Sequence, residues 1–204
     1  MRHVLRISGF LLIAAGILLF FWQDIREIFI DRMNDRVISA YQDDSRPVEV
    51  NRLESLVTGV DQSASYDMEG VAGVLRIASA DIEEPVFFGP VTEEKLKSGL
   101  SLVDGTDHVD MQNIPIAGHR VEGAGIRFNH LDRADAGDVV EFETAEGVRS
   151  YEITDMFEVD PSQVEVMDQK VDHPKQLTLI TCEDYNPETL LFEKRLIVKA
   201  TIIE

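Results

Sequence analysis

Residues 177–203, LTLITCEDYNPETLLFEKRLIVKATII, contain two apolar runs that each predict a β-strand. The first run, LTLIT at 177–181, ends at Cys182, and the following EDYNP at 183–187 is composed of turn-forming residues that predict a loop. The second run is RLIVKATII at 195–203. A side chain at the point where a strand gives way to a loop is rigidly held and still reachable, so Cys182 is a candidate functional residue.

Upstream of this stretch, the same pattern of short apolar runs and turns begins at about residue 70. The further runs are GVLRI (73–77), PVFF (85–88), IPIA (114–117), VVEFET (139–144) and YEITDMFEV (151–159). Alternation in the last run places Tyr151, Ile153, Phe157 and Val159 on one face. Thr92 predicts the N-cap of a short helix, TEEKLK, and Ala145-Glu146-Gly147 predicts a hairpin turn. Seven strands indicate an all-β domain, and composition leaves a barrel and a sandwich equally open.

The N-terminus carries a run of uncharged residues, ISGFLLIAAGILLFFWQ at 7–23, with Arg2 and Arg6 before it and Asp24 after it. Its length is at the short end for a bilayer-spanning helix, and a cleaved signal peptide is the alternative. The run ends in bulky residues and lacks a small-residue cleavage site, which favours an uncleaved anchor over residues 1–23. The basic residues precede the span, so we expect a single-pass protein with a cytoplasmic N-terminus and an extracellular domain.

Residues 24–69 connect this anchor to the strand-rich region. Apolar residues at helical spacing predict a juxtamembrane helix that simply continues the membrane helix; they are Ile25, Ile28, Phe29, Met33, Val37 and Tyr41. Residues 42–69 are polar, contain Pro47 and predict a tether. The expected organisation is therefore an anchor at 1–23, a helix and tether at 24–69, and a folded domain at 70–204.

The composition excludes several classes of function. Among 204 residues, 38 Asp and Glu against 19 Lys and Arg give a net charge of −19, which would repel nucleic acid. Cys182 is the only cysteine of the chain, which excludes an intrachain disulfide framework and a cysteine-based zinc site. A single thiol is either an inert buried side chain or a nucleophile.

A nucleophilic thiol needs a nearby base or cation that favours the thiolate. The folded domain offers His108, His119, His130 and His173. His119 ranks first because it follows the strand run IPIAG as Cys182 follows LTLIT, and Arg195 at the start of the last run is the candidate cation.

Three segments, TLITC at 178–182, IAGHR at 116–120 and FEKRLIV at 192–198, resemble the active-site segments of the sortases, the cysteine transpeptidases of Gram-positive cell surfaces. GPVTEEKLKSG at 89–99 and CEDYNPET at 182–189 extend the resemblance, which runs from about residue 70 to the C-terminus. The N-terminal anchor and the lack of a lid-like insertion favour class A, the housekeeping type. The resemblance implies a closed eight-stranded β-barrel with short helices.

The resemblance also implies a mechanism and partners. Cys182 would cleave an LPXTG-type sorting signal between Thr and Gly through a thioester, His119 would act as general acid and base, and Arg195 would stabilise the oxyanion. The clients would be LPXTG-bearing surface proteins, and the acceptor would be the amine of a peptidoglycan precursor, lipid II. The alternatives are a membrane-tethered thiol protease, which hydrolyses the motif, and a non-catalytic wall-binding domain.

Two further sets of residues follow from the resemblance. The apolar groove for the sorting motif would be formed by Ala117, Val166, Met167, Ile180, Thr181 and Phe192. No cofactor is expected to be required, although some class A sortases are stimulated by calcium. Here Asp104, Asp107 and Asp110 could contribute to a weak calcium site, but Met111 and Gln169 stand where carboxylates are expected.

Overall fold

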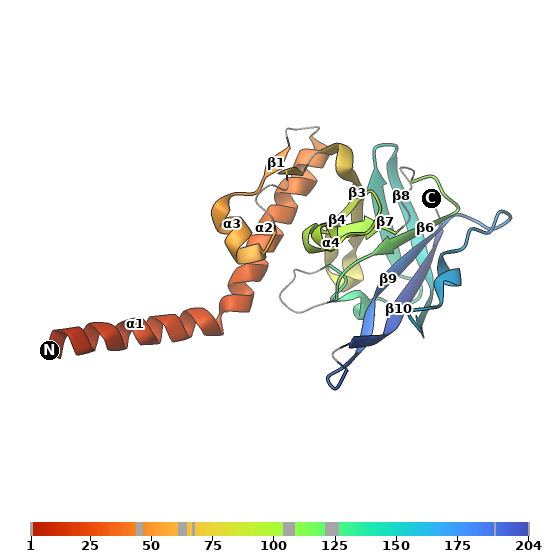
Figure 1. The fold of residues 1–204 in the computed structure, drawn as a ribbon. Coiled ribbons are helices and arrows are strands. Elements are labelled where there is room, and N and C mark those ends of the chain that lie inside the picture. Colours follow the sequence, from red (N-terminus) through yellow and green to blue (C-terminus); the bar gives the residue numbers. More distant parts are fainter. Residues whose placement is uncertain are drawn as a thin grey trace.

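The computed structural model describes residues 2–43, 47–60, 65–66, 68–103, 109–120, 127–189 and 191–203. They form a closed β-barrel and a pair of long N-terminal helices, the first of which projects away from the barrel (Figure 1). The barrel was one of the two architectures that the strand count left open, and it is the one that the family resemblance implied.

The eight strands of the barrel follow the order β10-β8-β7-β3-β4-β5-β6-β9, and β9 closes the barrel by pairing with β10. They are β3 (Val71–Ile77), β4 (Ile82–Phe87), β5 (Leu100–Leu102), β6 (Asn113–Ala117), β7 (Val139–Thr144), β8 (Gly147–Val159), β9 (Gln176–Asn186) and β10 (Leu191–Ile202). The strand pairs β4–β5 and β6–β9 are parallel, and the others are antiparallel. The barrel is therefore mixed.

Short helices connect the strands. The helix α4 (Glu93–Ser98) joins β4 to the parallel β5, and the hydroxyl of its N-cap Thr92 accepts a hydrogen bond from the Lys95 backbone N–H, as the sequence predicted. The 3₁₀ turns are η1 (Met68–Gly70), η2 (Ala78–Ala80), η3 (Leu131–Arg133) and η4 (Val164–Met167). The predicted hairpin turn between β7 and β8 is also present, with Gly147 at φ 121°.

The barrel interior is filled by apolar side chains from alternate strand positions, because successive side chains of a strand point to opposite faces. They include Leu75, Ile77, Val86, Ile114, Ile116, Val140, Phe142, Tyr151, Leu177, Leu179 and Val198. Burying each such side chain contributes about 1.5–3 kcal/mol before conformational entropy is subtracted. This interior fixes the strands that carry the candidate site.

The structure corrects the predicted end of the strand at 177–181. β9 continues past Cys182 to Asn186, so the loop predicted for residues 183–187 is wrong over most of its length. The extension is stable because it pairs with the N-terminal part of β10, with Phe192 opposite Tyr185. The turn comes only after Asn186, whose side-chain oxygen accepts a hydrogen bond from the Glu188 N–H at 2.8 Å.

A β-bulge corrects the predicted face of β8. Lys199 of β10 pairs with Asp155, whereas the next residue, Ala200, pairs with Ile153, so β8 holds one extra residue at this point. A bulge moves the following side chains to the opposite face. Tyr151 and Ile153 are accordingly buried, whereas Phe157 is 38% exposed.

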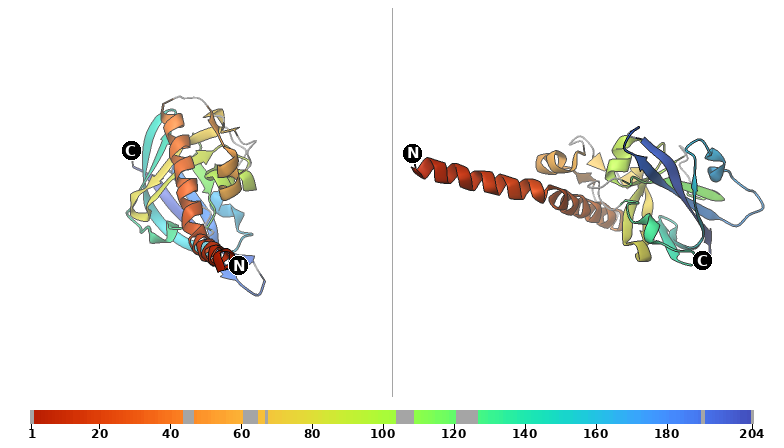
Figure 2. Two further views of the ribbon diagram at one scale, coloured as in Figure 1. Left: turned by 90° about the vertical axis from the view of Figure 1, so that its left-hand side faces the viewer. Right: turned by 90° about the horizontal axis from the view of Figure 1, so that it is seen from below.

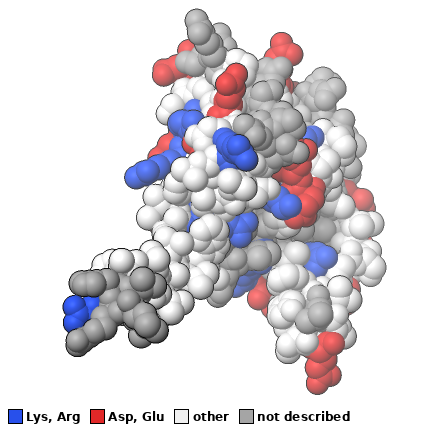
Figure 3. Space-filling view, turned by 60° about the vertical axis from the view of Figure 1, so that its left-hand side comes forward, with Lys and Arg blue, Asp and Glu red and all other residues white. Residues whose placement is uncertain are grey.

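The N-terminal helices α1 (Arg2–Phe20) and α2 (Trp22–Gln42) meet at a bend of 56°. Within the described part of the chain, neither helix alone has the length and apolar content to cross a bilayer, but the bent pair together meets that criterion. The views in Figure 2 show α1 extending away from the domain. In Figure 3 the described surface of the projecting helix is uncharged except near its tip, whereas the domain surface carries both signs.

The sequence predicted that the helix at 24–41 simply continues the membrane helix, and this prediction is wrong for α2. The C-terminal half of its apolar stripe packs on the domain, where Met33 and Val37 are buried in one cluster with Val71 and Phe87, whereas Ile28 is 49% exposed. The stripe had the spacing of a helix that packs on a core, and the 56° bend at Phe21 separates it from α1.

The described residues of the predicted tether also fold against this helix. Residues 48–49 form β1 (Val48–Glu49), which pairs with β2 (Ser65–Tyr66), and α3 (Arg52–Thr58) begins at a capping box formed by Asn51 and Glu54. Val50 and Val60 are buried in the same apolar cluster. This segment differs from a solvated tether because its scattered valines find partners on α2.

Candidate active site

The strands β9 and β10 and the segment that directly follows β6 bring the candidate catalytic residues into one row. In the parallel pair β6–β9, Ala117 lies opposite Ile180, and the Gly118 N–H continues this register with a hydrogen bond of 3.1 Å to the Ile180 carbonyl. His119 and Cys182 lie two residues beyond Ala117 and Ile180, so they are level with each other. In the antiparallel pair β9–β10, Cys182 lies directly opposite Arg195. Neighbouring strands are about 4.8 Å apart, so the row His119–Cys182–Arg195 spans two strand spacings.

The row lies on the outer face of the barrel. Leu177 and Leu179 of β9 point into the core, so alternation turns Cys182 outward, and its exposure is intermediate. In β10, Leu196 and Val198 point inward and Arg195 outward in the same way. The thiol is thus held by a core strand and remains reachable from outside.

The surroundings of His119 are closely packed. Its imidazole Nε2 lies 3.4 Å from Oε2 of Glu93 on α4, and its carbonyl accepts a hydrogen bond of 3.1 Å from the Phe128 N–H. A Cβ on the preceding Gly118 would lie 2.5 Å from Leu100 Cδ2 and 2.6 Å from Phe128 Cδ2. Only glycine permits this close approach, which places the backbone of His119 against the buried Phe128 ring.

An ion pair that the sequence analysis did not identify joins the residues that follow the histidine and the cysteine. Arg120 pairs with Glu183, and its other guanidinium nitrogen donates to Asp132 Oδ2 at 2.9 Å. The pair links the segment that follows β6 to β9 beside the candidate residues. The sequence does hold a signal for this ion pair, because opposite charges directly follow His119 and Cys182. That signal becomes informative only once β6 and β9 are known to be parallel neighbours.

The Arg195 guanidinium lies close to the backbone of its own hairpin. Its Nη1 donates hydrogen bonds to the carbonyl oxygens of Lys194, at 2.9 Å, and Phe192, at 3.4 Å. Both hydrogen bonds are donated by Nη1, which is one of the three nitrogens of the Arg195 guanidinium, a group with five N–H donors in total.

The other histidines are separate from this row. His130 is half-buried, with its Nδ1 buried and without a hydrogen-bond partner, and His173 is exposed in a turn. His108 lies outside the described residues. Of the described histidines, only His119 is in register with Cys182.

The sortase domain family matches residues 75–203 of the chain. The chain belongs to the sortase family. It is similar to sortase A of Staphylococcus aureus (strain NCTC 8325 / PS 47), with 35% identity over 204 residues that cover 100% of this chain and 98% of the relative. It is also similar to sortase A of Bacillus anthracis, with 33% identity over 121 residues that cover 59% of this chain and 56% of the relative.

Solved structures agree with this assignment. The structure of Listeria monocytogenes sortase A matches with a TM-score of 0.57 and 25% identity, over 66% of this chain and 88% of that chain. A Clostridium perfringens sortase D5 matches the fold with a TM-score of 0.61 and 22% identity, over 85% and 99% of the two chains. Sortases are cysteine transpeptidases, and this chain is a sortase A-like transpeptidase.

Part of the expected substrate groove of this sortase lies beside the row. Ala117 and Ile180 share the outer face with Cys182, and η4 carries Val166 and Met167 over the same strands. The Asn113 side chain holds η4 by donating to the Val166 carbonyl at 3.3 Å.

Lys199 provides a second attachment of η4 to the barrel. Its ammonium group donates to the Val166 carbonyl and, at 2.7 Å, to the Thr178 hydroxyl. Burial, together with the nearby Lys170, lowers the pKa of Lys199 to about 8. The Val166 carbonyl of η4 is therefore fixed to β6 and β10 by polar contacts.

Two of the expected groove residues are not brought to this face. The Thr181 side chain is buried, and its hydroxyl donates to the Gly118 carbonyl at 2.9 Å, so it joins the two strands. Phe192 is on the opposite face of the hairpin from Arg195 and packs against Tyr185, with ring centroids 5.2 Å apart. Strand alternation accounts for the placement of Phe192, because β10 begins at Leu191 and not at residue 195 as predicted.

Of the three candidate calcium ligands, only Asp110 lies among the described residues. Asp104 and Asp107 lie outside the described residues, and Asp110 faces two cations, forming an ion pair with Lys175 and lying 3.5 Å from Arg149. The bond to Lys175 lowers the pKa of the Asp110 carboxyl. Among the described residues, no group of three His, Cys, Asp or Glu side chains could hold a metal ion.

Gln169 stands at a position where a carboxylate was expected. Its side chain links the segment after η4 to Asn113, the first residue of β6. Its oxygen accepts from the Asn113 N–H at 3.0 Å, and its nitrogen donates to the Asn113 carbonyl at 2.7 Å. Both polar atoms of the amide thus bond to the backbone of Asn113.

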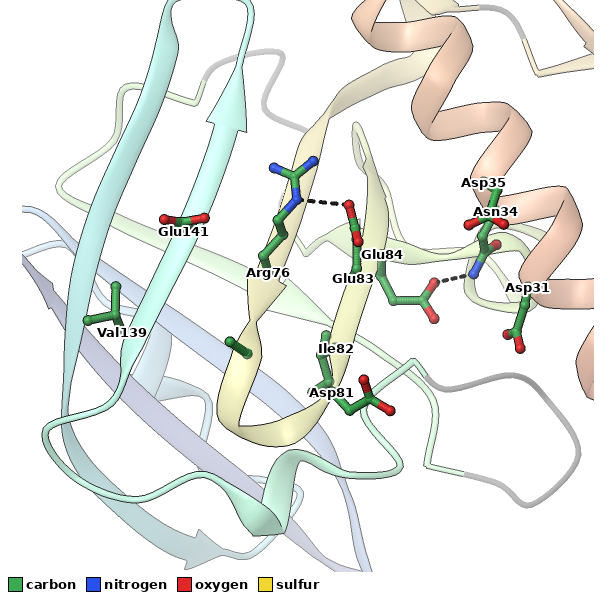
Figure 4. A pocket seen from close by; sticks show the side chains of 11 residues that line it. Asp31, Asn34, Asp35, Arg76, Asp81, Ile82, Glu83, Glu84, Val139 and Glu141 are labelled. Carbon is green, nitrogen blue, oxygen red and sulfur yellow. Dashed lines mark hydrogen bonds and ion pairs between the residues drawn. The ribbon is translucent and has the colours of Figure 1, made fainter.

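A separate cavity of about 550 Å³ lies between α2 and the β3–β4 hairpin (Figure 4). Acidic side chains dominate its lining, which includes Asp31, Asp35, Asp81, Glu83, Glu84 and Glu141. None of the candidate catalytic residues lines it. The cavity is therefore separate from the row His119–Cys182–Arg195.

Proposed function

We propose that this sortase cleaves an LPXTG-type sorting signal between Thr and Gly and transfers the resulting acyl group to the amine of a peptidoglycan precursor, lipid II. The observation that carries the proposal is the register that aligns Cys182 on β9 with Arg195 on β10 and with His119, two residues beyond the end of β6. A nucleophile, a proton carrier and an oxyanion donor at one level of one face are what acyl transfer through a thioester requires.

The reaction divides into two halves. The Cys182 sulfur attacks the Thr carbonyl carbon, and Arg195 stabilises the charge on the carbonyl oxygen. His119 donates a proton to the glycine nitrogen as the Thr–Gly bond breaks, which leaves a thioester. An incoming amine then attacks the thioester carbon, His119 accepts the amine proton, and the sulfur leaves to regenerate the resting enzyme.

The groove beside the row accommodates the apolar residues of the motif in this proposal. Ala117 and Ile180 form its floor, and Val166 and Met167 on η4 form its wall, for the Leu and Pro side chains. The proposal also places α1 in the cell membrane with a cytoplasmic N-terminus. The catalytic domain is then extracellular, where surface proteins and lipid-linked precursors meet.

Transfer and hydrolysis are separated by the fate of the thioester. We expect an LPXTG peptide incubated with the protein and a peptide amine to yield a ligated product detectable by mass spectrometry. Hydrolysis alone, unchanged by the amine, would indicate the thiol protease. No mass adduct between the chain's single cysteine and an LPXTG-derived electrophile would contradict both enzymatic functions.

Replacing Arg195 by alanine is expected to lower kcat/KM on an LPXTG peptide by about 10²–10³-fold, because one electrostatic donor to an oxyanion commonly contributes that much. Lys194→Ala is the matched control, since Lys194 is partly exposed on the same strand and pairs with Asp160 at 3.2 Å. Steady-state kinetics of the two folded variants test this. A nearly unchanged rate in Arg195→Ala would exclude its oxyanion role.

We propose that calcium is not required. A calcium ion would join the segment before β6 to the segment before β9, and the contacts of Gln169 with Asn113 and of Lys175 with Asp110 already join these two segments. Turnover of an LPXTG peptide is expected to change only modestly, by less than about threefold, between added calcium and EDTA, since a site with few charged ligands binds calcium weakly. A drop of about tenfold or more on chelation would show a working calcium site.

A further inference from the structure

A buried polar cluster joins α2 to the barrel at one end of the acidic cavity. Asn34 of α2 donates from Nδ2 to Oε2 of Glu84 on β4 at 2.9 Å, as Figure 4 shows. Arg127 pairs with the same carboxylate and donates from Nη1 to Asn34 Oδ1 at 3.1 Å. The three residues, called here the Asn34–Glu84–Arg127 cluster, are 4%, 1% and 0% exposed.

The cluster also holds the backbone of Arg127. The Arg127 N–H donates to Glu84 Oε1 at 2.7 Å, and its Nη2 donates to the Lys97 carbonyl at 2.7 Å. Arg127 has φ 43°, in the left-handed region that a residue other than glycine rarely adopts. Because this conformation is unfavourable by itself, the contacts to Glu84 are what keep the backbone in it.

Arg127 directly precedes the residue that supports His119. The Phe128 N–H donates to the His119 carbonyl at 3.1 Å, and the Phe128 ring lies against Gly118. A shift of the backbone at Arg127 would move Phe128 and, with it, the backbone of His119. The path from α2 to His119 therefore consists of consecutive direct contacts through Asn34, Glu84 with Arg127, and Phe128.

The composition of the cluster fits a role in positioning. Burying a charged pair costs desolvation that the attraction between the charges often fails to recover, so an apolar contact would serve stability equally well. Charged, directional hydrogen bonds do fix one geometry, because each donor and acceptor must align. The apolar cluster around Val37 already attaches α2 to the domain.

We propose that the Asn34–Glu84–Arg127 cluster positions His119, so that α2 contributes to turnover through Asn34 and does not serve only to connect the anchor to the barrel. The inference rests on the proposed general acid–base role of His119. The residues of the cluster are positioning residues, because none of them lies in the row His119–Cys182–Arg195.

The test uses the full chain in detergent and compares two buried positions of α2. Asn34→Leu removes both hydrogen bonds of the amide, whereas Val37→Ala, one turn further along, removes only apolar contact. Both variants are expected to lower the midpoint of thermal unfolding. Only Asn34→Leu is expected to lower kcat, by about tenfold with KM within about twofold of wild type, because small displacements of a catalytic group are costly to the chemical step.

Further variants keep the test informative if Asn34→Leu fails to fold. Asn34→Ser retains a hydroxyl that can donate and accept, so we expect a kcat between those of Asn34→Leu and wild type. Arg127→Lys retains the charge but cannot contact Asn34, Glu84 and Lys97 together, so it is expected to lower kcat at least as far as Asn34→Leu.

Two results would overturn the inference. One is wild-type kcat in both the Asn34 and the Arg127 variants, and the other is an equal loss of kcat in Val37→Ala, which would indicate a general effect of α2 docking. His119→Ala separates this inference from the proposed function. An active His119→Ala protein would refute the catalytic role itself, whereas an inactive one with unaffected cluster variants would refute only the positioning role.

Discussion

Cys182→Ala is expected to lower both cleavage and ligation of an LPXTG peptide by more than about 10⁴-fold, because removal of a nucleophile that forms a covalent intermediate leaves only substrate binding and electrostatic stabilisation. The substitution removes one outward-facing sulfur and leaves the inward-facing Leu179 and Thr181 untouched. The midpoint of thermal unfolding should therefore stay close to that of the wild type.

The chain's single cysteine makes the measurement direct. Intact-mass analysis of the wild type with a peptide electrophile is expected to show one adduct, and the Cys182→Ala protein none. Product formation by purified Cys182→Ala protein at a substantial fraction of the wild-type rate would contradict the thioester mechanism.

The strands of the barrel could largely be predicted from the sequence, because half-buried strands leave an alternating or continuous apolar pattern. Seven of the eight strands correspond to such runs. The exception is β5, whose three residues Leu100–Leu102 are too few for a periodic pattern. The parallel pairing of β5 with β4 depends on how the intervening α4 packs, and a single sequence does not show this packing.

The candidate site could be predicted as residues but not as an arrangement. His119 and Cys182 were singled out because each follows an apolar strand run, and the structure places these two residues in register. The two runs are parallel neighbours, so their ends lie at the same edge. The pairing itself leaves no trace in a single sequence, and neither does the one-residue bulge that exposes Phe157.

The N-terminal region could not be predicted because its residues have two possible partners. The stripe containing Met33 and Val37 suits a membrane or a protein core equally, and only the packing against Val71 and Phe87 decides between them. Asn34 lay unnoticed between these two residues, since a lone polar side chain in a helix is ordinarily solvated. Its partners Glu84 and Arg127 are 50 and 93 residues away along the chain.

His119→Ala is expected to lower both half-reactions by about 10³-fold or more, because the glycine nitrogen must gain a proton to leave and the incoming amine must lose one. His173→Ala is the control, since His173 is exposed in a turn and is not in register with Cys182. Wild-type rates in His119→Ala would assign the proton transfers to another group.

The contact between His119 and Glu93 adds a second comparison to this prediction. Glu93 is an exposed residue 3.4 Å from the imidazole, and exposed polar contacts of this kind contribute about 0–1 kcal/mol even between charged groups, so Glu93→Gln should alter turnover far less than His119→Ala.

The double variant Cys182→Ala/His119→Ala tests whether the thiol and the imidazole act in the same reaction. If the thiol and the imidazole act as one unit, its residual rate should equal that of Cys182→Ala, since the histidine has no proton to transfer once the nucleophile is gone. A further large drop in the double variant would mean that His119 assists a reaction that does not pass through Cys182.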